Sequence, residues 1–301
     1  MKTSPPHPFQ TVFRPGLFAG RTAIVTGGGS GIGRCIAHEL AALGTRVALV
    51  GRKVEKLEAV AREIAEAEGA SAPAATCHSC DIREEDRVRE TVAAISKEFG
   101  RIDFLVNDAG GQFAAPLESI SAKGWDTVVR NNLTGGFLMA RECYTQSMKA
   151  AAKAGHPGAI VNIIADMWAG MPGMGHSGAA RAGMLNLTET ASLEWAPIRV
   201  NAVAPGWIAS SGMDHYPEEM AAHIRALPKK VPLGRLGTES EVSAAVVFLL
   251  SPAAAFISGS CLRVDGAVPN AKRVWDHPIA RGKTEAYDGF HLATLPRILR
   301  D

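Results

Sequence analysis

The sequence predicts an α/β fold: a doubly wound, mainly parallel, seven-stranded sheet with helices on both faces, in a single domain. The first observation is that short apolar runs, typical of buried parallel strands, alternate with segments of helical period. The second is that a glycine-rich turn directly follows the first apolar run. The third is that no proline- or serine-rich linker interrupts the alternation between residues 20 and 266, which predicts one domain over that range.

Six of the expected strands are short runs rich in Val, Ile, Leu and Ala, at residues 22–26, 46–50, 102–106, 159–163, 198–203 and 261–264. Another strand is expected to end at Cys77 to Cys80. Apolar residues between the strands recur on one face of a helix, as in Val54, Leu57, Val60 and Ile64, in Val88, Val92, Ile95 and Phe99, and in Val242, Val246 and Leu249. This strand-then-helix order places helices on both faces of a parallel sheet.

Two segments lie outside the alternation. Residues 1–19 form a polar lead-in, and residues 267–301 form a tail with little periodicity. The aromatic residues Trp275, Tyr287 and Phe290 of the tail are expected to pack on the chain or on a partner, because they are costly to leave in water. Within the domain, residues 209–236 precede the last long helix and are expected to form a substrate lid.

Charge and composition exclude several classes of protein. The 32 Lys and Arg nearly balance the 30 Asp and Glu, so no broad basic field for a nucleic-acid partner is expected. The apolar run from Ala244 to Leu250 is too short to span a bilayer, and neither a signal region nor a peroxisomal address is apparent, which predicts a cytoplasmic protein without a membrane partner. Five scattered cysteines with a single C-x-x-C predict neither a disulfide framework nor a metal site.

The glycine-rich turn, Thr26-Gly27-Gly28-Gly29-Ser30-Gly31-Ile32-Gly33, lies between an expected strand and an expected helix. In that position glycines allow the backbone to approach a diphosphate at the helix N-terminus, so the turn predicts a dinucleotide site. Where an acidic residue would contact the ribose of NAD, the second strand ends in Gly51-Arg52-Lys53. Two cations in place of a carboxylate predict NADP(H), although the same pair would also suit a solvated helix start.

The spacing of these glycines resembles that of the short-chain dehydrogenase/reductase family. Three further segments agree with it: Cys80-Asp81-Ile82, Asn107-Asp108-Ala109-Gly110 with one change, and Pro205-Gly206-Trp207-Ile208 with Ser210. The resemblance spans about residues 20–266 and implies a Rossmann fold. The cofactor contacts that it implies, with the two cations, are Gly27, Ser30, Gly31, Ile32, Gly33, Arg52, Lys53, Asp81, Ile82, Asn107, Ala109, Gly110, Arg181, Pro205, Gly206, Ile208 and Ser210.

The catalytic positions depart from that family. Its pattern contains an Asn, a Ser and a Tyr-x-x-x-Lys, and only Asn132 matches. The Ser position holds Ile164 or Ala165, and the Tyr and Lys positions hold Ser177 and Arg181. The chain has three tyrosines, none near this position in sequence, and one of them, Tyr216, falls in the expected lid.

The missing tyrosine bears on the chemistry. Reduction of a carbonyl produces a basic alkoxide that needs a positioned acid, whereas hydride addition to an α,β-unsaturated thioester produces an enolate that needs charge stabilisation first. Asn132, Ser177 and the fixed cation Arg181 suit an enolate oxygen, and His176 is a candidate proton donor beside water. The alternative is a degenerate site that binds cofactor and has no activity.

Four segments resemble the peroxisomal trans-2-enoyl-CoA reductase branch of the family: His176–Gly183, Gly110–Phe113, Lys123–Trp125 and Leu249–Ala254. That branch and the related 2,4-dienoyl-CoA reductases reduce C=C bonds of acyl-CoA esters with NADPH, so the resemblance implies this reaction and an acyl-CoA substrate. In the dienoyl reductases a tyrosine lies near the position that Asp166 occupies here. An ionised Asp166 would repel an enolate, and the sequence leaves the role of Asp166 open.

The lid offers an apolar wall for an acyl chain in Met213, Met220, Ile224 and Leu227, with Arg225, Lys229 and Lys230 placed to meet CoA phosphates. An amphipathic helix with a solvated basic end is the plainer interpretation. The helices expected at 133–152 and 177–195 resemble the pairing helices of the family, which implies a homotetramer or homodimer.

Two other functions stay open at this point. One is a carbonyl or alcohol dehydrogenase that uses Tyr216 or His176 as a displaced acid. The other is a non-catalytic NADP(H)-binding protein that acts through an interaction.

Overall fold

A computed structural model describes residues 8–69, 73–216, 218–271 and 280–300. In these residues seven strands form one sheet in the order β3-β2-β1-β4-β5-β6-β7, and every neighbouring pair is parallel. The strands are β1 (Thr22–Thr26), β2 (Arg46–Gly51), β3 (Thr76–Ser79), β4 (Phe104–Asn107), β5 (Ala159–Ile163), β6 (Arg199–Pro205) and β7 (Cys261–Val264). The predicted doubly wound fold is therefore confirmed, and β4 begins two residues later than expected.

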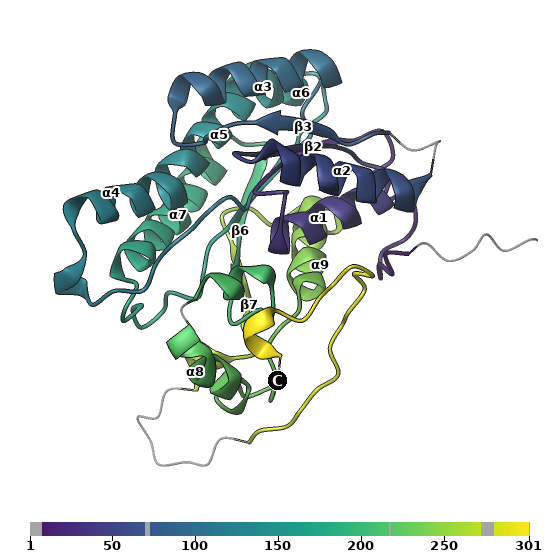
Figure 1. Cartoon of the computed structure of the whole chain (residues 1–301). Coiled ribbons are helices and arrows are strands. Elements are labelled where there is room, and N and C mark those ends of the chain that lie inside the picture. The colour runs from purple at the N-terminus through teal and green to yellow at the C-terminus, as the bar shows by residue number, and fades with distance from the viewer. Residues whose placement is uncertain (1–7, 70–72, 217, 272–279, 301) are drawn as a thin grey trace, which may run out of the picture.

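Helices cover both faces of the sheet (Figure 1). One face packs against α1 (Gly31–Ala42), α2 (Val54–Glu68) and α9 (Glu239–Leu250). The other packs against α3 (Glu85–Phe99), α5 (Gly135–Cys143) and α7 (Gly175–Glu194). The predicted apolar faces of these helices are buried, except that Phe99 of α3 is partly buried and Val54, the first residue of α2, is 41% exposed.

The helix expected at 133–152 is longer than predicted. It begins at α4 (Ala122–Val129) and continues through η2 (Arg130–Thr134), α5, η3 (Tyr144–Met148) and α6 (Lys149–Lys153). Both η2 and η3 are π-helical turns, which occur often at functional sites. The first of them contains Asn132.

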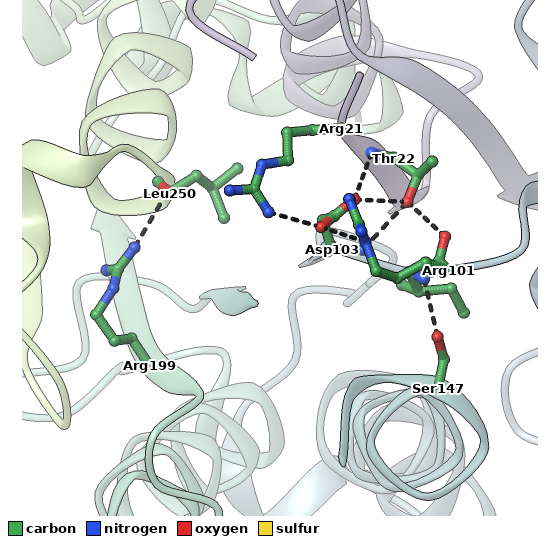
Figure 2. A network of polar contacts seen from close by, with 8 residues as sticks. Arg21, Thr22, Arg101, Asp103, Ser147, Arg199 and Leu250 are labelled. Atoms are coloured by element: carbon green, nitrogen blue, oxygen red, sulfur yellow. Dashed lines mark hydrogen bonds and ion pairs between the residues drawn. The ribbon is translucent and has the colours of Figure 1, made fainter. Parts of the chain in front are cut away.

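The amino end of the sheet is held by a closed network of charges (Figure 2). The side chain of Asp103, immediately before β4, is fully buried, and its Oδ1 accepts hydrogen bonds from Arg21 Nη1 and Arg101 Nε, each at 2.8 Å. Its Oδ2 accepts from the Thr22 backbone N–H at 3.0 Å. Both oxygens of the buried carboxylate are therefore paired, as burial of a charge requires.

The tail returns to the body of the protein. Phe290 is buried against Phe9 of the lead-in, and the Tyr287 hydroxyl donates to Gln10 O at 2.8 Å. The expectation that the tail aromatics pack on the chain is confirmed for these two residues, while Trp275 lies outside the described residues. The remaining elements of the lid and tail are short: η4 (Ser211–His215), η5 (Glu218–Met220), α8 (Ala221–Ala226), η6 (Leu227–Lys229), η8 (Val268–Asn270) and η9 (Arg297–Leu299).

Among the described residues, none of the helices has both the length and the apolar character to cross a membrane. All five cysteines are free, and in the same residues no cluster of His, Cys, Asp or Glu could hold a metal ion.

Candidate active site

The glycine-rich turn joins β1 to α1 at the carboxyl edge of the sheet. Gly27 and Gly31 have φ angles of +72° and +56°, which side-chain-bearing residues rarely adopt. A Cβ on Gly33 would lie 2.6 Å from Gly27 O, so the close approach of turn and helix also requires glycine. Ser30, the N-cap of α1, makes no side-chain cap, which leaves the first amides of the helix facing the edge. This cradle fits the diphosphate of a dinucleotide.

Thr26 fastens the turn to the neighbouring strand. Its Oγ1 accepts the backbone N–H groups of Asp108 and Ala109, each at 3.0 Å, and so ties the end of β1 to the segment that follows β4. Thr26 was not among the predicted site residues. The sequence feature that could have indicated its role is that Thr26 is a polar residue at the end of a buried strand.

Asp108 lies directly beneath the turn. Its Oδ2 is 2.6 Å from the position of a Cβ on Gly33 and 3.1 Å from one on Gly27. Burial raises the pKa of the Asp108 carboxyl to about 7, against the opposing effects of Arg181 and of the Gly33 N–H. The family pattern has an uncharged Asn at this position, so the carboxyl group introduces a proton-binding site next to the cofactor cradle.

Arg52 and Lys53 are exposed at the end of β2 and the start of α2, open to a ribose phosphate. Asp81, expected near the adenine, already accepts from Arg83 Nε at 2.8 Å, and this ion pair lowers the pKa of its carboxyl. Ile82 is buried beneath it. The two cations are thus free to approach a ligand, whereas the Asp81 carboxylate is partly used within the protein.

Asn107 lies deeper than its predicted cofactor role suggests. Its Nδ2 donates to Asn162 Oδ1 at 2.9 Å and to Gly136 O at 3.1 Å, and Asn162 Nδ2 donates to Thr188 Oγ1 at 2.9 Å. These bonds link β4, β5, α5 and α7. The side chain of Asn107 therefore fixes the elements on which the catalytic candidates stand.

Asn132, Ser177 and Arg181 converge at the carboxyl ends of β4 and β5. Arg181 donates from Nη1 to Ile163 O at 2.7 Å and from Nη2 to Asn132 Oδ1 at 3.2 Å. Asn132 also exchanges two hydrogen bonds with the backbone of Gly111, at 2.9 and 3.0 Å. Burial lowers the pKa of the Arg181 guanidinium to about 10, with Asp108 opposing the shift, so Arg181 stays a cation at neutral pH. A Cβ on Gly110 would lie 2.5 Å from Arg181 Nη2 and 2.8 Å from Asn132 Oδ1, so a side chain there would displace this pair.

Ser177 precedes Arg181 by four residues, one turn along the same face of α7. Its hydroxyl donates to Gln112 Oε1 at 2.6 Å. Gln112 is exposed at the rim of the site and was missed as a functional residue, although it stands next to the Gly110-Gly111 pair. The Ser177 side chain is thus tied to the segment after β4, next to the Gly111 backbone that Asn132 binds.

His176 is completely buried, and its ring meets Phe113 edge to face at 4.5 Å. Its Nδ1 accepts the Ser177 backbone N–H at 2.8 Å, which places the proton of the neutral ring on Nε2. Within the described residues, Nε2 of His176 and Nε of Arg181 are buried without a hydrogen-bond partner. Such groups are uncommon in native proteins, and two of them border this one site.

The segment after β6 closes the other side. Pro205 O accepts the Asp166 N–H at 3.1 Å, and Gly206 donates to Val264 O at 2.9 Å. Ile164, at one of the two places considered for the family serine, is buried in the core. Ile208 is buried as well, and Ser210 forms the N-cap of η4, where the lid begins.

The lid differs from its predicted form. Met213, Ile224 and Leu227 are buried together with Ile298 of the tail, so they form the core of the lid and no open wall for an acyl chain. Arg225 donates to the carbonyls of Ile298 and Arg300 and is not free to meet a CoA phosphate. These two expectations were wrong because the tail covers the face that the sequence appeared to leave open. Lys229 and Lys230 remain exposed.

Tyr216 of the lid approaches the start of α7. Its hydroxyl lies 4.0 Å from Met174 Sδ, and Met174 is three residues before Ser177. The structure therefore brings this tyrosine near the site, without placing it at the family position.

Known proteins resemble the chain over most of its length. A family model described as enoyl-(acyl carrier protein) reductase matches residues 27–268. A probable 2,4-dienoyl-CoA reductase of Bacillus subtilis (strain 168) is 37% identical over 82% of this chain and 95% of its own length. A gluconate 5-dehydrogenase of Gluconobacter oxydans (strain 621H) is 35% identical over 84% and 97%.

A solved structure, the citronellol catabolism dehydrogenase of Pseudomonas aeruginosa PAO1, is 58% identical and superposes with a TM-score of 0.75 over 86% of this chain and 99% of its own. The matches agree with the glycine cradle, the parallel sheet and the strand-end segments that carried the resemblance. The chain belongs to the short-chain dehydrogenase/reductase family, whose members are oxidoreductases that use a nicotinamide nucleotide.

Proposed function

We propose that the protein is an NADPH-dependent reductase of a C=C bond conjugated to a thioester, as in a trans-2-enoyl-CoA or 2,4-dienoyl-CoA. One observation carries the proposal: where the family has its tyrosine acid and lysine, α7 carries Ser177 and Arg181 one helical turn apart, and Arg181 is hydrogen-bonded to Asn132. This set supplies a hydroxyl, an amide and a permanent cation, which stabilise a developing negative charge. It supplies no acid that readily releases a proton at neutral pH.

The bound NADPH supplies a hydride to the β-carbon of the substrate. The chain then holds the resulting enolate oxygen through Arg181 and the Ser177 hydroxyl, while Asn132 keeps the guanidinium in place. The Ser177 hydroxyl carries a single proton, so to donate to the enolate it exchanges its hydrogen bond to Gln112 Oε1 for one to the substrate. The α-carbon takes its proton later, from water, because the His176 ring accepts the Ser177 N–H at Nδ1 and is therefore neutral, with an Nε2 proton that is only weakly acidic.

The choice of NADPH follows from Arg52 and Lys53, which are exposed where a carboxylate would bind the ribose of NAD. The names of the relatives support an acyl-CoA substrate through the dienoyl-CoA reductases. The citronellol catabolism dehydrogenase adds a branched, unsaturated chain as a substrate class to include in the assay.

A second candidate is reduction of a carbonyl or oxidation of an alcohol with Tyr216 as the acid. Its specific support is the position of the Tyr216 hydroxyl beside Met174, together with the sugar-acid and polyol dehydrogenases among the relatives. The two reactions place opposite demands on Tyr216, so one substitution separates them.

The test is NADPH consumption with straight and branched enoyl-CoA and dienoyl-CoA esters, beside matched ketones, aldehydes and sugar acids. Ser177→Ala is expected to lower kcat for the thioesters about 100-fold, because one donor to the enolate is lost. Tyr216→Phe is expected to leave that rate within about twofold. Turnover of carbonyl compounds alone, abolished in Tyr216→Phe, would replace the proposal by the second candidate.

We infer in addition that the protein is a homo-oligomer. Leu193 near the end of α7 and Phe256 after α9 are 82% and fully exposed, and Leu262 on the edge strand β7 is 38% exposed. Apolar side chains gathered at a sheet edge are typical of subunit contacts. Light scattering of the purified protein distinguishes a monomer from a dimer or tetramer.

A further inference from the structure

Residues 280–300, here called the strap, lie beyond the segment that the family model matches. In Figure 1 the strap is yellow: it climbs from the lower part of the molecule to α1 and α9 and returns to α8. Three sets of contacts attach it along this path. Each of them joins elements that border the proposed active site.

The first attachment is at the far end of the lid. Gly282 donates its backbone N–H to Pro232 O at 3.3 Å, and Arg235 Nε donates to Thr284 O at 3.1 Å. Arg235 also forms an ion pair with Glu241, the residue that caps α9 together with Thr238. The strap thus begins where the lid joins α9.

The second attachment is on the body. Thr238 Oγ1 donates to Tyr287 O at 2.6 Å, and Ser240 Oγ accepts the Phe290 N–H at 3.1 Å. Phe290 is 2% exposed, and the Arg34 guanidinium of α1 lies 5.2 Å from the centre of its ring. This part of the strap is therefore fixed to α9 and to the helix whose N-terminus faces the cofactor cradle.

The third attachment is on the lid itself. Ile298 is 3% exposed and packs among Met213, Ile224 and Leu227. Its backbone N–H is accepted by Asp214 Oδ1 at 3.1 Å, and Arg225 Nε donates to its carbonyl at 2.9 Å. The apolar core of the lid, and two of its charged residues, are thus completed by the strap.

We propose that the strap positions the substrate lid over Ser177, with Ile298 as the positioning residue, and so determines the KM for substrate. The lid begins at Ser210 and carries Tyr216 to within 4.0 Å of Met174 Sδ, three residues before Ser177. Lid helices this short have little stability of their own and depend on packing for a fixed position. Ile298 provides that packing through Met213 and Ile224, in the same apolar cluster against which Tyr216 packs.

Two variants test the inference, one from each side of the contact, in the full-length protein. Ile298→Ala removes the apolar contact from the strap, and Arg225→Ala removes the hydrogen bonds from the lid. Leu295→Ala is the matched control, because Leu295 lies on the same strap and is 54% exposed. Ile298→Val is the conservative rescue.

Both test variants are expected to raise the substrate KM about fivefold or more, with the NADPH Kd within about twofold of wild type. Hydrogen exchange of residues 211–229 is expected to accelerate about tenfold, while exchange of α2 stays unchanged. Leu295→Ala and Ile298→Val are expected to behave as wild type in both measurements.

Unchanged lid exchange and unchanged KM in both test variants would overturn the inference. Equal changes in α2 exchange and in the NADPH Kd would also overturn it, because they would mean general destabilisation. The KM readout rests on the proposed function, but the exchange readout does not. If no thioester is turned over, that result counts against the proposed function alone, and lid exchange still decides the role of the strap.

Discussion

The two ends of the parallel sheet differ in how their buried charged and polar groups are paired. At the amino end, Asp103 is surrounded by Arg21, Arg101 and Thr22, and each carboxylate oxygen has partners (Figure 2). At the carboxyl end, Arg181 Nε and His176 Nε2 are buried without partners among the described residues, and burial raises the pKa of Asp108 to about 7. The first arrangement stabilises the fold. The second leaves polar groups available to ligands and shifts the pKa of a carboxyl group toward neutrality.

The largest effect on activity is expected for substitutions of Arg181. Arg181→Ala is expected to lower kcat/KM for the thioester substrate about 1000-fold, because a buried cation at the proposed enolate site is removed. Arg181→Lys is expected to recover about one tenth of the activity, since it keeps the charge but cannot reach Ile163 O and Asn132 Oδ1 together. Steady-state kinetics and circular dichroism check both variants. A loss of less than about tenfold in Arg181→Ala would show that the cation is not part of the chemistry.

The opposite result is expected at Asp103. Asp103→Asn leaves Arg21 and Arg101 without their carboxylate and is expected to cost about 3 kcal/mol of stability, or about 5–10 °C in Tm. At 25 °C the folded variant is expected to keep kcat/KM within about twofold, because the network is at the far end of the sheet. Thermal unfolding and kinetics on the same preparation provide the measurement. Lost activity in a fully folded protein would remove the distinction between the two ends.

Arg52 and Lys53, near the carboxyl end of the sheet, are expected to determine the preference for NADPH over NADH. Arg52→Ala with Lys53→Ala is expected to weaken NADPH about 30-fold and to leave NADH within about twofold, since each charge-assisted contact to a 2′-phosphate is lost only for NADPH. Arg62→Ala, which removes an exposed cation farther along α2, serves as the control. Titrations followed by nicotinamide fluorescence measure the dissociation constants of NADPH and NADH for wild type and for both variants. Equal weakening of both nucleotides would contradict the proposed NADPH preference.

Asp108 gives the smallest effect and the clearest pH signature. In the unfolded chain its carboxyl titrates near its usual value of about 4, but in the fold its pKa is raised to about 7. The folded protein therefore holds a proton that the unfolded chain has lost, and this contribution to stability declines as the pH rises from about 4 to 7.

Asp108→Asn removes that dependence. The Tm of the variant relative to wild type is expected to rise between about pH 5 and pH 8, by a few degrees at most. Asp126→Asn, an exposed exchange of the same kind, is expected to give a difference that does not vary with pH. A pH-independent difference in Asp108→Asn as well would exclude Asp108 as the proton-binding group.

The sequence predicts those parts of the structure that depend on local hydrophobic periodicity and on turn residues. The strands and the glycine-rich turn follow from apolar period and turn chemistry, both of which are readable along the chain. The long helix from Ala122 was predicted too short, because a π turn at Asn132 leaves no signature in the apolar period.

The lid and the strap could not be predicted in the same way. Met213, Ile224 and Leu227 look like an open apolar face in sequence, and only the return of Ile298 from 70 residues away shows that they are covered. The roles of Gln112 and Thr26 depend on contacts between segments distant in sequence, so residue type alone did not single them out.

Transfer of the NADPH hydride to a C=C bond of a thioester is tested most directly by isotope labelling. NADPH deuterated at C4 of the nicotinamide is incubated with the best enoyl-CoA or dienoyl-CoA ester, and the product is examined by NMR. Deuterium at a carbon of the former C=C bond, with an unlabelled α-proton drawn from solvent and an unchanged rate in Tyr216→Phe, is the predicted result. Deuterium delivered only to carbonyl carbons of ketones or aldehydes, with no transfer to the thioesters, would contradict the account.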